Sequence, residues 1–192
     1  MSPITHLLVG WTVLEKAVPE RRDKAIVAIA GVLPDLDGLG IVIDFATRTL
    51  GLPETDHYQA FHRLYGHGLA AALVFALVAF TAAHRRLLTA ALSFVAVHLH
   101  FACDLLGSRG NGPDDIWGIW YFAPLSTAHE IAWTGQWPLV GWQNMLITAV
   151  LIGLVLERAA RRGYSPLVMV SPRADRELVA VLRKWRGIHS DR

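Results

Sequence analysis

Residues 64–104 read LYGHGLAAALVFALVAFTAAHRRLLTAALSFVAVHLHFACD. Two apolar stretches, 64–84 and 87–103, flank the pair Arg85-Arg86 and contain no Asp, Glu, Lys or Arg over 21 and 17 residues. A helix that crosses a bilayer needs about 20 mostly apolar residues. The pattern therefore predicts two membrane helices joined by a short basic turn, with histidines at the ends that lie far from this turn.

Other apolar stretches extend this picture to the rest of the chain. Residues 131–156 lack the same four residue types, residues 1–14 are uncharged, and residues 25–34 give a short segment of about 15 Å. The composition, 53% hydrophobic and 18% charged, is more apolar than that of a typical soluble domain. We expect an all-α, polytopic helical membrane protein with four to five membrane segments. A soluble helical bundle is the alternative, and charge-free stretches this long disfavour it.

The positive charges predict an orientation in the membrane. Fifteen of the 18 Lys and Arg residues lie in the loop after residue 14, in the Arg85-Arg86 turn or beyond residue 157. The exceptions are Arg48, Arg63 and Arg109. By the positive-inside rule the basic regions face the cytoplasm. The loops at 35–65 and 105–138 then lie outside, as expected for a multi-pass inner-membrane protein.

The chain divides by charge into a helical membrane domain, residues 1–163, and a basic cytoplasmic tail, residues 164–192. Ser171-Pro172 is typical of a helix start. On the helix that follows, basic residues surround one apolar face, which comprises Ala174, Leu178, Val181, Leu182 and Trp185. Such an amphipathic helix either lies on an anionic leaflet or docks on its own bundle.

Histidine and aspartate gather at the segment ends that this topology places outside. The seven residues are His6, Asp35, Asp37, His62, His67, His100 and Asp104. Ionisable groups at membrane depth are costly and indicate function. Because all seven lie at the same end of their segments, we expect them to converge.

Imidazole and carboxylate groups are ligands for zinc, manganese or iron, and seven suffice for two ions. We expect divalent metal ions, zinc first and manganese as the alternative, bound by these seven residues. His100 and Asp104 share a helical face, so Asp104 is a ligand, a general base or a group that orients the imidazole. Asp37 is a ligand or a bridging carboxylate with a catalytic role.

Other chemistries find little support in the sequence. His57 and His129 are expected on the outer surface, and His84 and His189 on the cytoplasmic side. Cys103 has no evident base beside it, which disfavours a nucleophilic role. A nucleophile elbow, a phosphate loop and a dinucleotide fingerprint are absent from the sequence. The basic residues flank membrane segments, so we expect no nucleic-acid partner.

Four ordered sequence blocks resemble the membrane-bound, predicted metal-dependent hydrolases, also called the YdjM-like family. They are Thr5-His6 with Gly10, residues 31–37 (GVLPDLD), His62-Arg63 with His67, and residues 100–106 (HFACDLL), followed by residues 108–110 (SRG) and 124–126 (PLS). In the third block Leu64, Gly66 and Gly68 replace the Gly, Thr and Ser usual in the family. His98 is additional in the fourth block. The resemblance implies a helical membrane protein with a metal site and a hydrolase activity, and a distant similarity to zinc-dependent phospholipase C and P1-type nucleases.

We therefore expect a membrane-bound metal-dependent hydrolase that acts on an ester or phosphoester, such as a phospholipid, at the outer face of the bilayer. In this hypothesis a metal-activated water attacks the substrate. The aromatic loop with Trp117, Trp120 and Tyr121 either holds a lipid substrate or anchors the protein in the membrane. The alternatives are a non-catalytic membrane scaffold with a structural metal, and a metal transporter or sensor.

Overall fold

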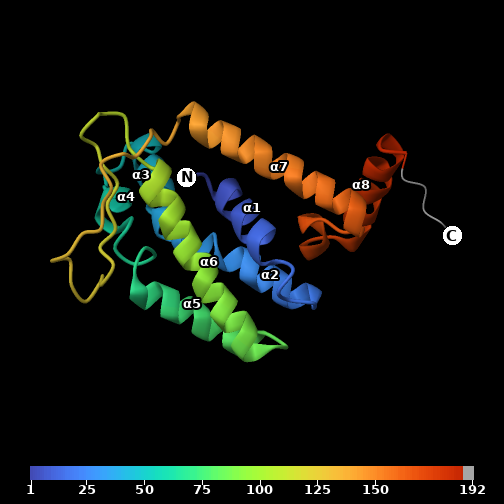
Figure 1. The fold of residues 1–192 in the computed structure, drawn as a ribbon. Coiled ribbons are helices and arrows are strands. Elements are labelled where there is room, and N and C mark those ends of the chain that lie inside the picture. Colours follow the sequence, from blue (N-terminus) through green and yellow to red (C-terminus); the bar gives the residue numbers. More distant parts are fainter. Residues whose placement is uncertain (188–192) are drawn as a thin grey trace.

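The computed structural model describes residues 1–187, which fold almost entirely into helices (Figure 1). In chain order these are α1 (Pro3–Leu14), α2 (Arg21–Ala30), the 3-10 helix η1 (Leu33–Leu39), α3 (Gly40–Thr49), α4 (His57–Phe61), α5 (Leu69–Ala82), α6 (Arg86–Gly107), α7 (Trp142–Arg162), the 3-10 helix η2 (Pro166–Met169) and α8 (Pro172–Trp185). The described residues form no β-strand, only two isolated bridges. The all-α prediction is confirmed, and His189 lies outside the described residues.

The predicted hairpin is present, with α5 packed along α6 on one side of the molecule (Figure 1). Its tight turn is held by the carboxylate of Asp23 on α2. Asp23 Oδ1 accepts a hydrogen bond from the backbone N–H of His84 at 2.9 Å, and Oδ2 accepts from the N–H of Arg85 at 2.8 Å. Thr89 Oγ1 also donates to Oδ2, at 3.0 Å. These bonds satisfy backbone donors that a helix start leaves without partners.

The short second segment does not continue as one straight helix. α2 ends at Ala30, and the chain continues through η1 and α3 after a bend of 49°. Pro34 lies at the start of η1, where a missing N–H costs nothing. The bend brings η1, with Asp35 and Asp37, against α6 and α4.

Two helices, α6 and α7, are long and apolar enough to cross a membrane, and the bent pair formed by α2 with η1 and α3 could make a third span. α1 and α5 are apolar but have only 12 and 14 residues, or about 18 and 21 Å. The structure therefore supports two to three spans of the four to five predicted.

α7 begins at Trp142, eleven residues after the start of the charge-free stretch that predicted it. Residues 131–141 include Gly135, Pro138 and Gly141, which favour turns over helix. α7 runs beside α1, where Leu8 and Trp11 pack with Val155. The long connection between α6 and α7 lies with α3 and α4 at one end of the bundle (Figure 1).

The opposite end of the bundle gathers the basic loops. Lys24 lies 3.8 Å from the buried carboxylate of Glu15, which also accepts a hydrogen bond from Tyr164 OH at 2.6 Å and pairs with Arg162. Arg85 pairs with Glu20 at 3.0 Å. The basic regions that the sequence predicts on one side of the membrane are thus neighbours in the structure.

The C-terminal helix α8 starts as predicted, with Ser171 as its N-cap accepting from Ala174 N at 3.3 Å. It packs on α7 and η2 through buried Val179 and Asp175, whose carboxylate accepts two hydrogen bonds from Ser165. Trp185, on the predicted apolar face, stays 79% exposed. The helix is therefore docked on the bundle and still presents an apolar residue outward.

Candidate metal centre

The centre is built around α6, where His100 and Asp104 lie one turn apart on a buried face. His100 Nε2 lies 3.0 Å from Asp104 Oδ2, and both residues are at most 3% exposed. His100 Nδ1 donates to the carbonyl oxygen of Gly31 at 2.9 Å, since a carbonyl only accepts. This bond places a hydrogen on Nδ1, so Nε2, which lies beside Asp104, is the nitrogen left for a metal ion.

His67 reaches the same point from the loop before α5 and is fully buried. Its Nδ1 donates to Asp37 Oδ2 at 3.0 Å. Its Nε2 lies 3.1 Å from His100 Nε2 and 3.4 Å from Asp104 Oδ2. Two imidazoles held by outer hydrogen bonds thus direct their remaining nitrogens at one carboxylate, as in protein metal sites.

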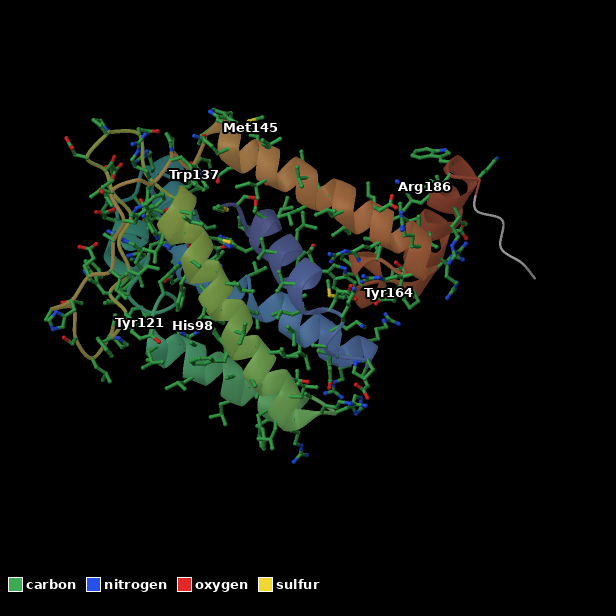
Figure 2. All side chains as sticks on the ribbon, viewed as in Figure 1. His98, Tyr121, Trp137, Met145, Tyr164 and Arg186 are labelled. Carbon is green, nitrogen blue, oxygen red and sulfur yellow. The ribbon has the colours of Figure 1, made fainter. Side chains whose placement is uncertain are left out.

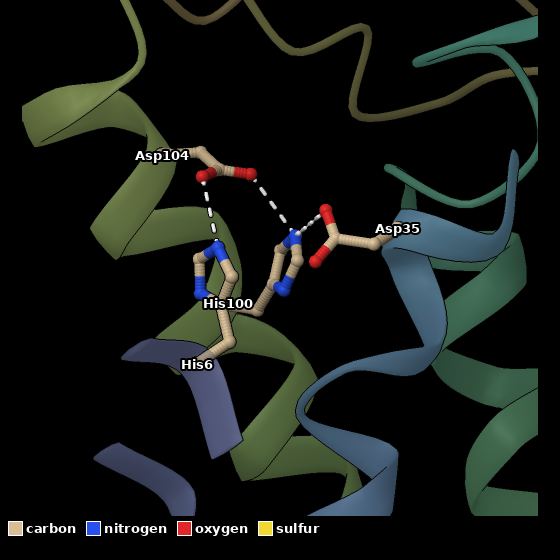
Figure 3. A group of neighbouring side chains, drawn as sticks. All are labelled: His6, Asp35, His100 and Asp104. Carbon is tan, nitrogen blue, oxygen red and sulfur yellow. Dashed lines mark ion pairs between the residues drawn. The ribbon is translucent and has the colours of Figure 1, made fainter. Parts of the chain in front are cut away.

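His6 enters from α1 and stacks on His100, with ring centroids 3.7 Å apart and an interplanar angle of 24°. His6 Nε2 lies 3.2 Å from Asp104 Oδ1, as Figure 3 shows. Neither ring nitrogen of His6 makes a hydrogen bond among the described residues, although the side chain is 2% exposed. A buried imidazole that makes no hydrogen bond is costly, and a bound cation would satisfy its nitrogen.

Asp35, on η1, completes this group from the other side (Figure 3). Its Oδ1 lies 3.7 Å from His100 Nε2, and its buried Oδ2 has no hydrogen-bond partner in the described part of the chain. One ligand atom from each of His6, Asp35, His100 and Asp104 lies within 4.8 Å of the others. The donor set fits a divalent ion such as zinc or manganese.

A second group, formed by Asp37, His62 and His67, lies beside the first. One ligand atom from each of these residues also lies within 4.8 Å of the others. Asp37 Oδ1 accepts from His62 Nδ1 at 2.7 Å, and Oδ2 accepts from His67 Nδ1. Oδ2 also accepts from the backbone N–H groups of Arg63 at 3.0 Å and Gly66 at 2.9 Å. Asp37 is therefore hydrogen-bonded through both oxygens and organises the whole loop from 62 to 67.

The loop that carries His62 and His67 lies wholly before α5, which begins at Leu69. The left-handed residue is Arg63, with φ of 77°. Gly66 is needed for a close approach, because a Cβ there would lie 2.3 Å from the Pro34 carbonyl oxygen. Arg63 is therefore a non-glycine residue in the left-handed region, a conformation that is uncommon and is often found at functional sites.

A cavity of about 210 Å³ opens onto the cluster and is lined by Asp35, Tyr58, His62, Asp104, Ser108 and Trp117, together with Met1, Pro3 and Leu139. Ser108 Oγ donates to Asp104 Oδ1 at 2.8 Å, and the amino group of Met1 contacts the same oxygen. Burial raises the pKa of Tyr58, and the negative charge of Asp37 acts in the same direction. Tyr58 therefore keeps a neutral hydroxyl in the cavity.

Trp117 forms one wall of this cavity and is held there rather than free in the outer loop. Gln136, 2% exposed, bonds to both the N–H and the carbonyl oxygen of Trp117, at 2.8 and 2.6 Å. The Arg63 guanidinium lies 4.6 Å from the centroid of the Trp117 ring. Trp117 is therefore held in place as part of the cavity lining.

The structure brings together all seven residues that the sequence singled out. Of the other histidines that the structure describes, His84 and His129 are exposed, and His57 is half-buried at the start of α4. His98 bonds to Phe94 O at 2.8 Å and Tyr121 OH at 3.0 Å (Figure 2). Cys103 is half-buried and outside both groups. Sequence reasoning missed Tyr58, Ser108 and Gln136 as parts of the site. Tyr58 lies on the five-residue helix α4, Ser108 directly follows α6, and Gln136 lies in the connection to α7, so none belongs to a periodic pattern that could have pointed to it.

Fold and cluster together define a class of protein: a helical membrane protein with a buried His/Asp group that could hold a metal ion. The chain belongs to the YdjM inner membrane protein family, whose model matches residues 1–182. No match is found among curated proteins or among solved structures. The expected similarity to phospholipase C and P1-type nucleases is accordingly not shown.

Proposed function

We propose that this chain is a metal-dependent hydrolase of the inner membrane, acting on an ester or phosphoester at the non-cytoplasmic face. The main support is the convergence of the Nε2 atoms of His6, His67 and His100 on the carboxylate of Asp104. Two of these imidazoles are oriented through Nδ1 by Gly31 and Asp37. Such outer contacts are typical of histidines that bind metals.

The ligands that we assign to the ion are His6, His67, His100, Asp104 and Asp35. A divalent ion held there would polarise an ester or phosphoester oxygen and lower the pKa of a nearby water. Asp37, whose oxygens are both occupied, positions His67 and His62 in this assignment. Asp104 contacts three imidazoles, which suits a ligand better than a general base.

The protein groups in the cavity suit the proton transfers of hydrolysis. Water adds its oxygen to the phosphorus or carbonyl carbon, the bond to the leaving oxygen breaks, and one proton passes from the water to that oxygen. We assign this proton to His62, because its Nδ1 is bonded to Asp37 and its Nε2 remains free to accept and return it. Tyr58 would donate a hydrogen bond to the substrate, and Trp117 would limit access of bulk water.

The alternatives explain the structure less well. A structural metal normally has a closed shell of four ligands, whereas this cluster opens onto a cavity. A transporter requires a path to both sides of the membrane. Here the clustered groups lie at one end of the bundle, and the basic loops lie at the other.

Metal analysis combined with a substrate screen tests the proposal. The detergent-purified protein should contain bound divalent metal, and His67→Ala and His100→Ala should each lower its affinity by at least 10- to 100-fold. His84→Ala, at an exposed site at the far end, is the matched control and should retain the metal. Phospholipids and phosphodiesters are the substrates to screen. Equal metal in all variants would refute the site, and metal without any hydrolysis would favour the scaffold.

A further inference from the structure

A large groove runs between the first turn of α1 and the first three turns of α7. It has a volume of about 640 Å³, within the usual range of roughly 300–1,000 Å³ for ligand pockets. Its lining includes Pro3, Leu139, Met145, Thr148, Ala149 and Ile152. The helices meet below it, where Leu8 and Trp11 pack against Val155.

The groove is apolar although four polar side chains, those of Ser2, Thr5, Asn144 and Thr148, border it. Ser2 Oγ lies 2.8 Å from Thr5 Oγ1. Thr5 Oγ1 and Thr148 Oγ1 lie 2.7 Å apart, and Thr148 also donates to Asn144 O at 2.8 Å. Asn144 Nδ2 donates to the carbonyl oxygens of Gly107 and Leu139, both at 2.8 Å. Because these groups already have partners, they offer little to a polar ligand. No ionisable side chain lines the groove among the described residues.

The groove adjoins the cavity at the metal centre, since Met1, Pro3 and Leu139 line both spaces. The His/Asp cluster therefore lies on one side of these shared residues, and the apolar groove lies on the other. A ligand that fits both parts has a polar head group joined to a long hydrocarbon chain.

One wall of the groove is formed by α7, a helix that is long and apolar enough to span the membrane. Met145 is 71% exposed and Ile152 is 44% exposed on α7. Figure 2 shows Met145 at the same end of the molecule as Trp137, beside the connection that covers the site. In an inner-membrane protein, lipid chains are the apolar molecules that contact such a helix.

We propose that the groove between α1 and α7 binds one acyl chain of a membrane phospholipid and places its head-group phosphoester at the His/Asp cluster. This assignment rests on the proposed hydrolase function and names its substrate class. The lipid would enter laterally past the exposed side of α7. The binding free energy that the acyl chain contributes would grow with each methylene group buried, as it does for lipid anchors.

Photolabelling tests the groove without requiring activity. The full chain is placed in nanodiscs of phosphatidylethanolamine and phosphatidylglycerol, with a small fraction of phosphatidylglycerol that carries a diazirine on one acyl chain. Labelling should concentrate in residues 1–5 and 139–152. Ala149→Trp and Ile152→Trp fill the groove and should each lower the labelling of these residues about tenfold. This is the loss expected when two methylene groups of the acyl chain are displaced. Val150→Trp, at a 52% exposed neighbour outside the groove lining, should leave the labelling unchanged.

The outcomes separate this inference from the proposed function, because labelling is read with and without chelator. Uniform labelling of the exposed faces of α6 and α7, or labelling unaffected by both groove variants, overturns the acyl-chain site even if the protein hydrolyses lipids. Concentrated labelling that the variants abolish supports the site, including the case in which no metal or hydrolysis is detected. In that case the hydrolase proposal fails by itself.

Discussion

Nε2 of His67 and Nε2 of His100 lie 3.1 Å apart, beside the carboxylate of Asp104. His100 donates through Nδ1 to Gly31 O, and His67 donates through Nδ1 to Asp37. When both rings are neutral, two lone pairs meet at Nε2 and repel each other unless a proton or a metal cation lies between them. Zinc bonded to two such nitrogens at 2.0–2.1 Å would set them about 3.3 Å apart in a tetrahedral shell. The spacing therefore suits a shared metal ion.

Asp37→Asn should weaken metal binding by about 10- to 100-fold without removing a proposed ligand. The amide keeps the size of the carboxylate but offers only one acceptor oxygen, so His62 and His67 lose part of their orientation. Metal affinity would be measured by titrating chelator-treated protein and following the thermal unfolding midpoint. The metal-free midpoint should change much less than the metal-loaded one.

Asp35→Asn is the comparison variant on the same 3-10 helix. Its carboxylate has a buried oxygen without a hydrogen bond, as expected for a ligand rather than a positioning group. The loss of metal affinity should therefore at least equal that of Asp37→Asn. A smaller effect for Asp35→Asn would exchange the roles that we assign to these two residues.

Gly66→Ala should disrupt the centre through backbone contact. The added Cβ would lie 2.3 Å from Pro34 O and 2.8 Å from Asp37 Oδ2, so the loop must move away from η1. We expect weaker metal binding and a lower unfolding midpoint. Gly153→Ala on α7 is the matched control, since its Cβ would meet nothing within 4 Å. It should stabilise the helix by about 0.5–1 kcal/mol and retain the metal. Equal behaviour of the two variants would contradict the packing described for Gly66.

The sequence predicted the helical class, the hairpin around Arg85-Arg86 and the convergence of seven His and Asp residues, because each depends on charge placement along the chain. Hydrophobic runs report where helices can lie in a membrane, and ionisable residues at their ends are rare enough to stand out. The separate roles of Asp35 and Asp37 could not be predicted. They depend on which backbone N–H groups the folded loop directs at each carboxylate.

Segment boundaries were less predictable for a related reason. The run 131–156 lacks charge throughout, yet Gly135, Pro138 and Gly141 keep its first part out of α7. The bend between α2 and η1 likewise depends on tertiary packing against α6. Uncharged composition therefore does not define the number of full spans, since it does not distinguish a membrane helix from an apolar loop that covers a site.

Asp23→Ala should lower the free energy of unfolding by about 3 kcal/mol, because it leaves two backbone N–H groups and Thr89 without their charged acceptor. Glu20→Ala removes only the more exposed partner of Arg85 and should cost less than about 1 kcal/mol. Denaturant unfolding in detergent would measure both. Similar costs would show that the Asp23 contacts do not hold the α5–α6 turn.

The orientation in the membrane can be tested with single cysteines in a Cys103→Ala background, which removes the sole native thiol. Thr127 in the connection between α6 and α7, and Ala180 on α8, are both exposed and lie outside the cluster. With the basic end of the bundle in the cytoplasm, an impermeant maleimide added to intact cells should label Thr127→Cys and not Ala180→Cys. Permeabilised cells should label both, which controls for reactivity. Labelling of Ala180→Cys alone in intact cells would reverse the orientation and place the metal centre on the cytoplasmic side.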